Sequence, residues 1–100
     1  MLIYNVTIKI DLETHKEWLQ WMKAVHIPDV LKTGCFNDHK ICRLLNQDES
    51  EGFTYAIQYL CESMETVQKY QESYAPKLQQ EHTDRYKGRF VAFRTLMEEV

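Results

Sequence analysis

The sequence predicts an α+β domain of the ferredoxin-like type, in which two helices cover one face of a four-stranded antiparallel sheet. Three observations favour this fold class. Apolar residues alternate with polar ones near both ends of the chain, two long helical segments each precede a glycine, and a polar turn separates two apolar runs. The resulting order, β-α-β-β-α-β, is the split βαβ arrangement. Since 100 residues suffice for one core, we predict a single domain over residues 1–100.

The first half of the chain contains a predicted strand, a helix and a second strand. Residues 2–10 alternate in polarity and predict a half-buried strand. The residues DLET then offer capping side chains before a helix from Glu13 to Lys32, and Gly34 is placed to end that helix. Residues 36–45 predict the second strand. The alternating apolar side chains of the first strand are Leu2, Tyr4, Val6, Ile8 and Ile10.

The second half repeats this plan after the polar turn NQDESEG. Residues 53–62 predict a third strand, and Ser63 is a suitable N-cap for a second helix that extends to about Tyr86. Gly88 is placed to end this helix, and residues 89–97 predict the last strand. The two halves thereby supply the four strands and two helices of the fold.

The charge and cysteine content exclude several classes of function. With 12 basic and 15 acidic residues the net charge is -3, and no basic patch is present for nucleic acid or an anionic membrane surface. No apolar run approaches the ~18 residues of a membrane span. The first residues lack the basic region and the cleavage site of a signal peptide. Three cysteines match no zinc motif and indicate free thiols, so we expect a cytoplasmic protein.

The second, third and fourth strands carry apolar residues on both faces. In the fourth strand, Phe90 and Ala92 alternate with Val91 and Phe93, and the third strand has a similar two-sided pattern. A sheet with helices on one side only is expected to be more polar on the other side. A second copy of the chain is the simplest cover for an apolar second face. We therefore predict a homodimer that forms through the open sheet face.

Both predicted helices carry a histidine on an aromatic stripe. Side chains three or four positions apart lie on one face of a helix. The stripe of the first helix contains Trp18, Met22, Val25 and His26, with Trp21 beside it. The stripe of the second helix contains Val67, Tyr70, Tyr74, Leu78 and His82. Both histidines are therefore expected on, or at the margin of, the surface that faces the sheet.

Each predicted helix also contains an internal proline. Pro28 and Pro76 lack the backbone N–H of a regular helical residue, which leaves the carbonyl groups of Ala24 and Glu72 without their usual partners. We expect each helix to kink or to restart at its proline. Such a bend can open space between the helix and the sheet.

Two interpretations of these segments remain open. In the first, a pocket between helices and sheet binds a small molecule, and His26 and His82 are candidate catalytic residues because imidazole titrates near neutral pH. The predicted ligand-binding residues are Trp18, Met22, Tyr74 and Tyr4. In the second, each histidine hydrogen-bonds a free helix carbonyl, and the domain is a non-catalytic structural or protein-interaction module. Patterning alone favours the second, because aromatic stripes are ordinary in a helical core.

No metal or cofactor site is predicted. The two helix histidines lack a third ligand at a diagnostic spacing. The other two, His15 and His39, are expected at the surface. Cys42 and Cys61 fall inside predicted strands, where a thiol is usually a small buried apolar group. The chain has only three glycines, and none of them forms a phosphate-binding loop.

Two arginines, Arg43 and Arg94, lie in the middle of predicted strands. A buried arginine there needs a partner, because burial of an unpaired charge is costly. We expect an edge position, an outward-facing side chain or an ion pair across the dimer for each. The alternative is an anion-binding arginine in the cleft.

The stretches EWLQWMKAVHIPDVLKTGCF and YAPKLQQEHTDRYKGRFVAFRTLMEE resemble a small uncharacterised bacterial family, known mainly from Bacteroidetes, of stand-alone domains of unknown function. The similarity extends over nearly the whole chain. It implies the fold of the dimeric α/β barrels, a superfamily that includes antibiotic-biosynthesis-type monooxygenases, muconolactone isomerases and haem-degrading monooxygenases. If the domain is an enzyme, this resemblance implies cofactor-independent proton transfer or oxygenation.

The haem-degrading members of that superfamily pair an asparagine of the first strand with a histidine of the second helix. This chain has Asn5 and His82 at comparable places. Asn5 alternates with Tyr4 and Val6, so it is expected to face away from the helices. We therefore do not transfer the haem role, and we predict no cofactor.

Overall fold

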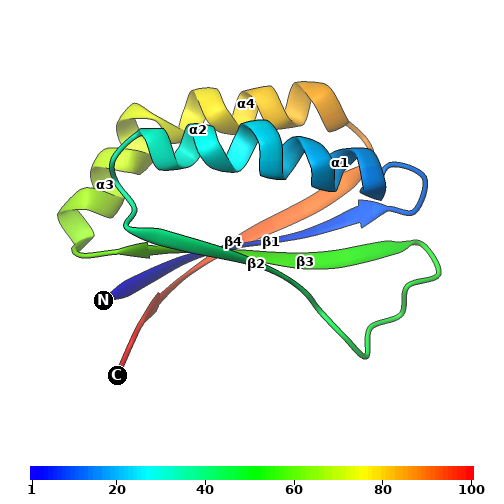
Figure 1. Ribbon diagram of the computed structural model, residues 1–100, viewed down its shortest axis with the longest axis horizontal. Helices are drawn as coiled ribbons and strands as arrows, with labels where there is room; N and C mark the ends of the chain where they lie inside the picture. The colour runs from blue at the N-terminus through cyan, green and yellow to red at the C-terminus, as the bar shows by residue number, and fades with distance from the viewer.

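The computed structural model describes residues 1–100, and its elements follow the predicted order (Figure 1). The four strands form one sheet in the order β2-β3-β1-β4, and every neighbouring pair is antiparallel. All the helices lie on one face of this sheet (Figure 1). The ferredoxin-like fold class is confirmed. The strands are β1 (Leu2–Asp11), β2 (Asp38–Arg43), β3 (Gly52–Cys61) and β4 (Phe90–Glu98).

The first helical segment is continuous but changes its winding. It consists of α1 (His15–Trp21), the π-helical turn η1 (Met22–His26) and α2 (Ile27–Lys32). The Ile27 N–H donates to the carbonyl of Met22, five residues back. Pro28 follows directly, in the first turn of α2, so the wider turn accommodates the missing N–H. The disturbance expected at Pro28 is confirmed and takes the form of a π turn.

The second helical segment is broken into α3 (Met64–Ser73) and α4 (Ala75–Tyr86). The Ser63 hydroxyl accepts the backbone N–H of Thr66 at 3.3 Å, which confirms the predicted N-cap. Tyr74 leaves the helical conformation, with φ -123° and ψ -39°, and Pro76 stands in the first turn of α4. The predicted stripe is interrupted at this break: Val67, Tyr70 and His82 are buried, whereas Tyr74 and Leu78 are only partly buried against the core.

The two faces of the sheet differ in their cover. Side chains of β1, β3 and the helices form one buried core on the helical face, and Ile10, Trp18 and Ile57 in it are fully buried. On the other face of β4, Val91 and Phe93 are 68% and 63% exposed. The apolar second face that the sequence pattern predicted is therefore present on β4, and no helix covers it (Figure 1).

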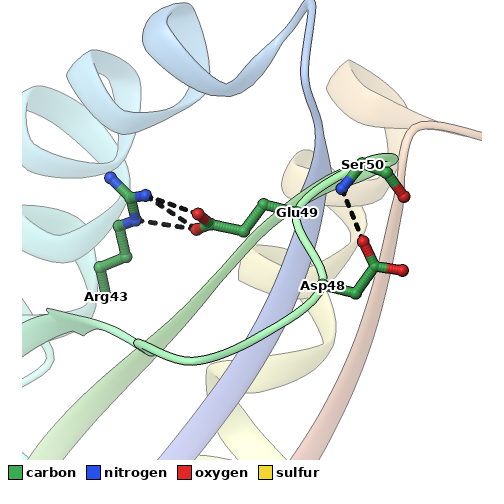
Figure 2. A network of polar contacts seen from close by, with 4 residues as sticks. All are labelled: Arg43, Asp48, Glu49 and Ser50. Carbon is green, nitrogen blue, oxygen red and sulfur yellow. Dashed lines mark hydrogen bonds and ion pairs between the residues drawn. The ribbon is translucent and has the colours of Figure 1, made fainter.

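The β2–β3 loop follows β2, which is the edge strand of the sheet farthest from β4. Arg43 pairs with Glu49 of this loop at 2.8 Å, and the Asp48 carboxylate accepts the Ser50 N–H (Figure 2). The Arg43 guanidinium also lies 4.4 Å from the centre of the Phe53 ring. Arg43 thus occupies an exposed edge strand, as predicted, and its ion-pair partner lies in the same chain.

No helix is long and apolar enough to cross a membrane. All three cysteines are free thiols; Cys35 and Cys61 are buried. Cys42 is exposed, which corrects the expectation of a buried thiol. The reason is that β2 is an edge strand and Cys42 lies on its uncovered face, opposite Ala56.

Candidate functional site

A cavity of about 190 Å³ lies between the helices and the sheet. Its wall is formed by side chains of β1, β3 and β4 on the sheet side and of η1, α2, α3 and α4 on the helical side. Most of the lining is apolar. The side chains that carry its chemistry are Tyr4, His26, Tyr70, Gln79, His82 and Arg94.

The cavity brings His26 and His82 together. His26 is the last residue of the π turn, whereas His82 lies in the middle of α4. Their ring centroids are 5.7 Å apart, with an angle of 63° between the ring planes. The expectation that both imidazoles face the sheet side of their helices agrees with this arrangement, although they are 56 positions apart in the chain.

Trp18 fixes the orientation of His82. The indole N–H of Trp18 donates to Nε2 of His82 at 2.9 Å, and Trp18 is fully buried. Because an indole nitrogen is only a donor, Nε2 must supply its lone pair. The proton of neutral His82 is therefore on Nδ1. This partner is a side chain of the other helical segment, and not the helix carbonyl that the structural interpretation expected.

His26 is held by stacking instead of by hydrogen bonding. Its ring stacks on Trp21, with centroids 5.3 Å apart and an angle of 30° between planes. Its Nδ1 is buried and has no hydrogen-bond partner. A buried polar atom without a partner costs free energy. Such an atom beside a cavity is more typical of a functional site than of a finished core.

Both imidazoles are neutral near pH 7. Burial lowers the pKa of His26 to about 4; Asp29 partly opposes this shift and the Arg94 charge reinforces it. Burial also lowers the pKa of His82 to about 4, and both His26 and Arg94 add to that effect. Neutral His26 can offer one donor and one acceptor to a bound molecule, whereas His82, whose Nε2 accepts from Trp18, offers its Nδ1–H donor.

Arg94 lies on the helical face of β4 and lines the same cavity. The edge position that we expected for Arg94 is confirmed, and its exposed side chain also lines the cavity, as in the anion-binding alternative. β4 is an edge strand, and Arg94 has the same parity as Phe90 and Ala92, which also line the cavity. This parity is visible in the sequence and was the signal available for placing Arg94 there.

Three tyrosines, Tyr4, Tyr59 and Tyr70, add hydroxyl groups to the wall. Burial raises the pKa of each phenol, so all three remain protonated donors at neutral pH. For Tyr4 the nearby Arg94 charge offsets part of that rise. The cavity therefore offers phenol donors close to one cation.

The four predicted ligand-binding residues lie at different places in the structure. Tyr4 and Met22 line the cavity. Trp18 lies behind His82 and reaches the cavity only through its hydrogen bond. Tyr74 does not line the cavity; it lies on a separate surface groove with Lys77, because the break between α3 and α4 turns it away.

Sequence reasoning missed several side chains of the wall. Tyr70 was placed on the predicted stripe without a role, and Gln79 and Thr83 were not considered. Gln79 and Thr83 lie three residues before and one residue after His82, so a helix that starts afresh at Ala75 brings them to the same side. No group of three or more histidine, cysteine or acidic side chains is placed to hold a metal ion.

A family model for a domain of unknown function, DUF4286, matches residues 1–100. The chain belongs to the DUF4286 family. This finding agrees with the resemblance to an uncharacterised family. No curated protein matches the chain in sequence.

Several solved structures resemble this DUF4286 chain over 99–100% of its length. A dimeric ferredoxin-like protein from an uncultured marine organism has a TM-score of 0.70 and 14% identity, over 100% of this chain and 95% of that chain. An ethyl tert-butyl ether d family protein from Bacillus halodurans gives 0.69 and 17%, over 100% of both chains. SnoaB, a cofactor-independent oxygenase from Streptomyces nogalater, gives 0.70 and 11%, over 99% and 93%. These likenesses show the fold.

Proposed function

We propose that this domain binds a small organic molecule in the cavity between helices and sheet, and that His26 and His82 transfer a proton to or from it. The observation that carries the proposal is the meeting of two neutral imidazoles from separate helical segments, 5.7 Å apart, on one cavity wall. Imidazole is the side chain most often used as a general acid or base.

The two histidines have different roles in this proposal. His82 is fixed by Trp18 with its Nε2 occupied, so its free function is the Nδ1–H donor. That donor can stabilise negative charge that develops on a bound carbonyl oxygen. His26 has no such restraint, and it is the candidate base. Trp18 acts as a positioning residue, because it sets the tautomer of His82.

The pKa of about 4 for His26 reflects the burial of its ring among the protein's own side chains. A general base works best when its pKa is close to the ambient pH. Negative charge on a bound molecule beside the ring raises the pKa of the imidazole toward neutrality. The proposed base is therefore activated by its own substrate.

The similarity to SnoaB supports chemistry without a bound cofactor, since that protein is a cofactor-independent oxygenase. Proton removal from an organic molecule leaves an electron-rich anion, and such an anion can either be reprotonated elsewhere or react with oxygen. Both outcomes begin with the same step at the same two histidines. Proton transfer is accordingly the activity that we propose to test first.

The test measures exchange of acidic C–H protons with solvent deuterium by NMR, for a panel of ketones and 2-oxo acids that includes phenylpyruvate. We expect the protein to accelerate exchange, and His26→Gln to reduce the acceleration by roughly a hundredfold or more. His39→Gln is the matched control, because His39 is exposed on β2, outside the cavity. Equal exchange rates for the wild type, His26→Gln and His82→Gln would leave the non-catalytic interpretation standing.

We further propose that the domain is a homodimer through the open sheet face. Phe93 and Val91 are exposed there, and Oδ1 of Asn5, on the same face of the central strand β1, is buried without a hydrogen-bond partner. A second copy would cover the apolar residues and can supply a donor to Asn5. The resemblance to a dimeric ferredoxin-like protein supports this packing.

Sedimentation equilibrium tests the dimer directly. We expect twice the chain mass of 12.0 kDa for the wild type and a monomer for Phe93→Glu. Leu45→Glu is the control, because Leu45 is 73% exposed in the β2–β3 loop, away from the open face. A wild-type monomer at micromolar concentration would refute the proposed packing.

A further inference from the structure

Arg94 is the only charged side chain in the wall of the cavity, if the two histidines are neutral as their pKa values require. No aspartate or glutamate lines the cavity. The remaining polar groups of the wall are phenol, amide and hydroxyl groups and the imidazoles, all of which are uncharged. The cavity therefore presents one positive charge and no negative charge to whatever it binds.

The other arginines of the chain are already engaged. Arg43 pairs with Glu49 at 2.8 Å, and Arg85 pairs with Glu17 at 3.3 Å. Arg89 donates to the hydroxyl of Thr14 at 2.9 Å. Arg94, by contrast, forms no ion pair. A guanidinium presents a planar fork of donors that fits a carboxylate with two parallel hydrogen bonds.

The surroundings of Arg94 are suited to an aromatic body. Rings of Tyr4, Tyr70, Phe90 and the two histidines line the cavity, and aliphatic side chains fill the wall between them. The His82 and Phe90 rings meet edge to face, with centroids 4.5 Å apart. Aromatic walls favour planar ligands, because stacked and edge-to-face contacts add to the burial of apolar surface.

The volume limits the size of the ligand. An apolar cavity of about 150 Å³ is known to bind benzene. The cavity here measures about 190 Å³, which leaves room for a single ring and one small polar group. Drug-sized ligands need pockets of about 300 Å³ or more. A fused polycyclic ligand is therefore too large for the cavity as it stands.

We propose that the ligand is a single-ring aromatic carboxylate, with its carboxylate on Arg94 and its ring between the tyrosines and the two imidazoles. This inference depends on the proposed function, since it names the class of molecule that the His26–His82 cavity takes. It also supplies the negative charge that the proposed activation of His26 requires. Arg94 is thus the specificity-determining residue of the site.

The test compares three probes of similar shape and different charge: benzoate, benzamide and benzylamine. Each is titrated into the full chain near neutral pH, and binding is followed through the NMR signal of the Trp18 indole N–H, which reports on His82. We expect benzoate to bind at least about tenfold more tightly than benzamide. We expect benzylamine not to bind. Arg94→Gln should remove the advantage of benzoate, whereas Arg43→Gln, on the far edge of the sheet, should keep it.

The outcomes separate this inference from the proposed function. Equal binding of benzoate and benzamide, or an unchanged preference in Arg94→Gln, overturns the anion inference and leaves a ligand-binding cavity. Tight binding of benzoate without any histidine-dependent proton exchange supports the ligand class and overturns the catalytic proposal. Failure of all three probes to move the Trp18 signal overturns the ligand class and the binding cavity together.

Discussion

The two helical segments each contain a proline that lacks a backbone N–H, and they accommodate it in different ways. In the first, the chain remains helical through Pro28, and Ile27 before it keeps φ -60° and ψ -46°. The wider π turn before Pro28 accommodates the missing N–H without a break in the helix. In the second, Tyr74 departs from helical geometry and α4 restarts with Pro76 in its first turn, where a proline costs nothing.

The difference decides which side chains reach the cavity. Met22, His26 and Val30 are four residues apart and all line it, so the first helix keeps one face through its π turn. In the second segment the regular helical spacing is interrupted at Tyr74. The residues that line the cavity beyond this break depend on where α4 begins, at Ala75. A proline in a helical sequence therefore indicates a position where the set of residues that face the sheet can change. The conformation of the residue before the proline decides whether that set changes.

Trp18 joins the two segments, and its removal should have the largest effect on stability. Trp18→Ala deletes a fully buried ring and leaves Nε2 of His82 without its donor. We expect a loss of about 3–5 kcal/mol in the free energy of unfolding, measured by urea denaturation. Trp21→Ala serves as the comparison, because Trp21 is only half-buried and stacks on His26. Similar losses for the two variants would contradict the linking role of Trp18.

Acidification should sharpen the comparison between His26 and His82. Each has a folded-state pKa of about 4 against an ordinary value of 6.5. Between these values the unfolded chain binds more protons than the folded chain, so stability is complete above about pH 6.5 and is lost as the pH falls toward 4. At about 1.4 kcal/mol per pKa unit, the loss is on the order of 3 kcal/mol for each histidine.

The measurement is the free energy of unfolding against pH for the wild type, His26→Gln and His82→Gln. Each variant should flatten the slope between pH 4 and 6.5 by about half, because each removes one of the two groups that must take up a proton. His39→Gln should leave the slope unchanged, since His39 is exposed outside the cavity. A full slope in either cavity variant would show that its imidazole is already charged in the folded protein.

The sequence predicted the fold because its strongest signals are local. The Ser63 cap and the glycines after each helix act within a few residues, and both are found in the structure. The alternation of β1 identified the strand, although Asn5 and Thr7 on its other face are buried as well. The π turn and the break at Tyr74 depend on how each helix packs on the sheet, and no local signal distinguishes them. Val25 shows the consequence: it was placed on the core stripe, yet it is 41% exposed within the π turn.

The candidate site was predictable only in part for the same reason. Both histidines and Met22 follow from helical spacing, but the contact between Trp18 and His82 joins positions 64 residues apart. Arg94 lies on an edge strand as expected, but its place in the cavity wall was only the alternative, because a charged residue in mid-strand was judged by its desolvation cost. The exposed side chain of Arg94 does not carry that cost, and no sequence pattern reports a cavity between two layers.

Replacement of the glycine after either helical segment by alanine should lower the stability by the same amount, whereas replacements of the two prolines should differ in effect. Gly34 and Gly88 have φ of +77° and +78°, and an added Cβ would meet no atom within 4 Å at either position. Replacement by alanine therefore introduces backbone strain without a clash. We expect each Gly→Ala variant to lose about 1–2 kcal/mol of stability. Thermal unfolding of both variants checks the equality, and a marked difference between them would mean that one end is supported by its surroundings.

The smallest expected effect concerns the prolines themselves. Pro76→Ala should lose roughly 0.4–1 kcal/mol, because proline in the first turn of α4 restricts only the unfolded chain. Pro28→Ala loses the same restriction but gains an N–H within a helix, so its net change should be smaller still. The two variants should differ more clearly in structure. Because the wide turn accommodates the missing N–H of Pro28, replacement of the proline should let the turn tighten and shift the His26 signals in NMR, whereas Pro76→Ala should leave the His82 signals in place. Unshifted His26 signals would show that packing of Met22 and His26 on the sheet, and not the proline, maintains the wide turn.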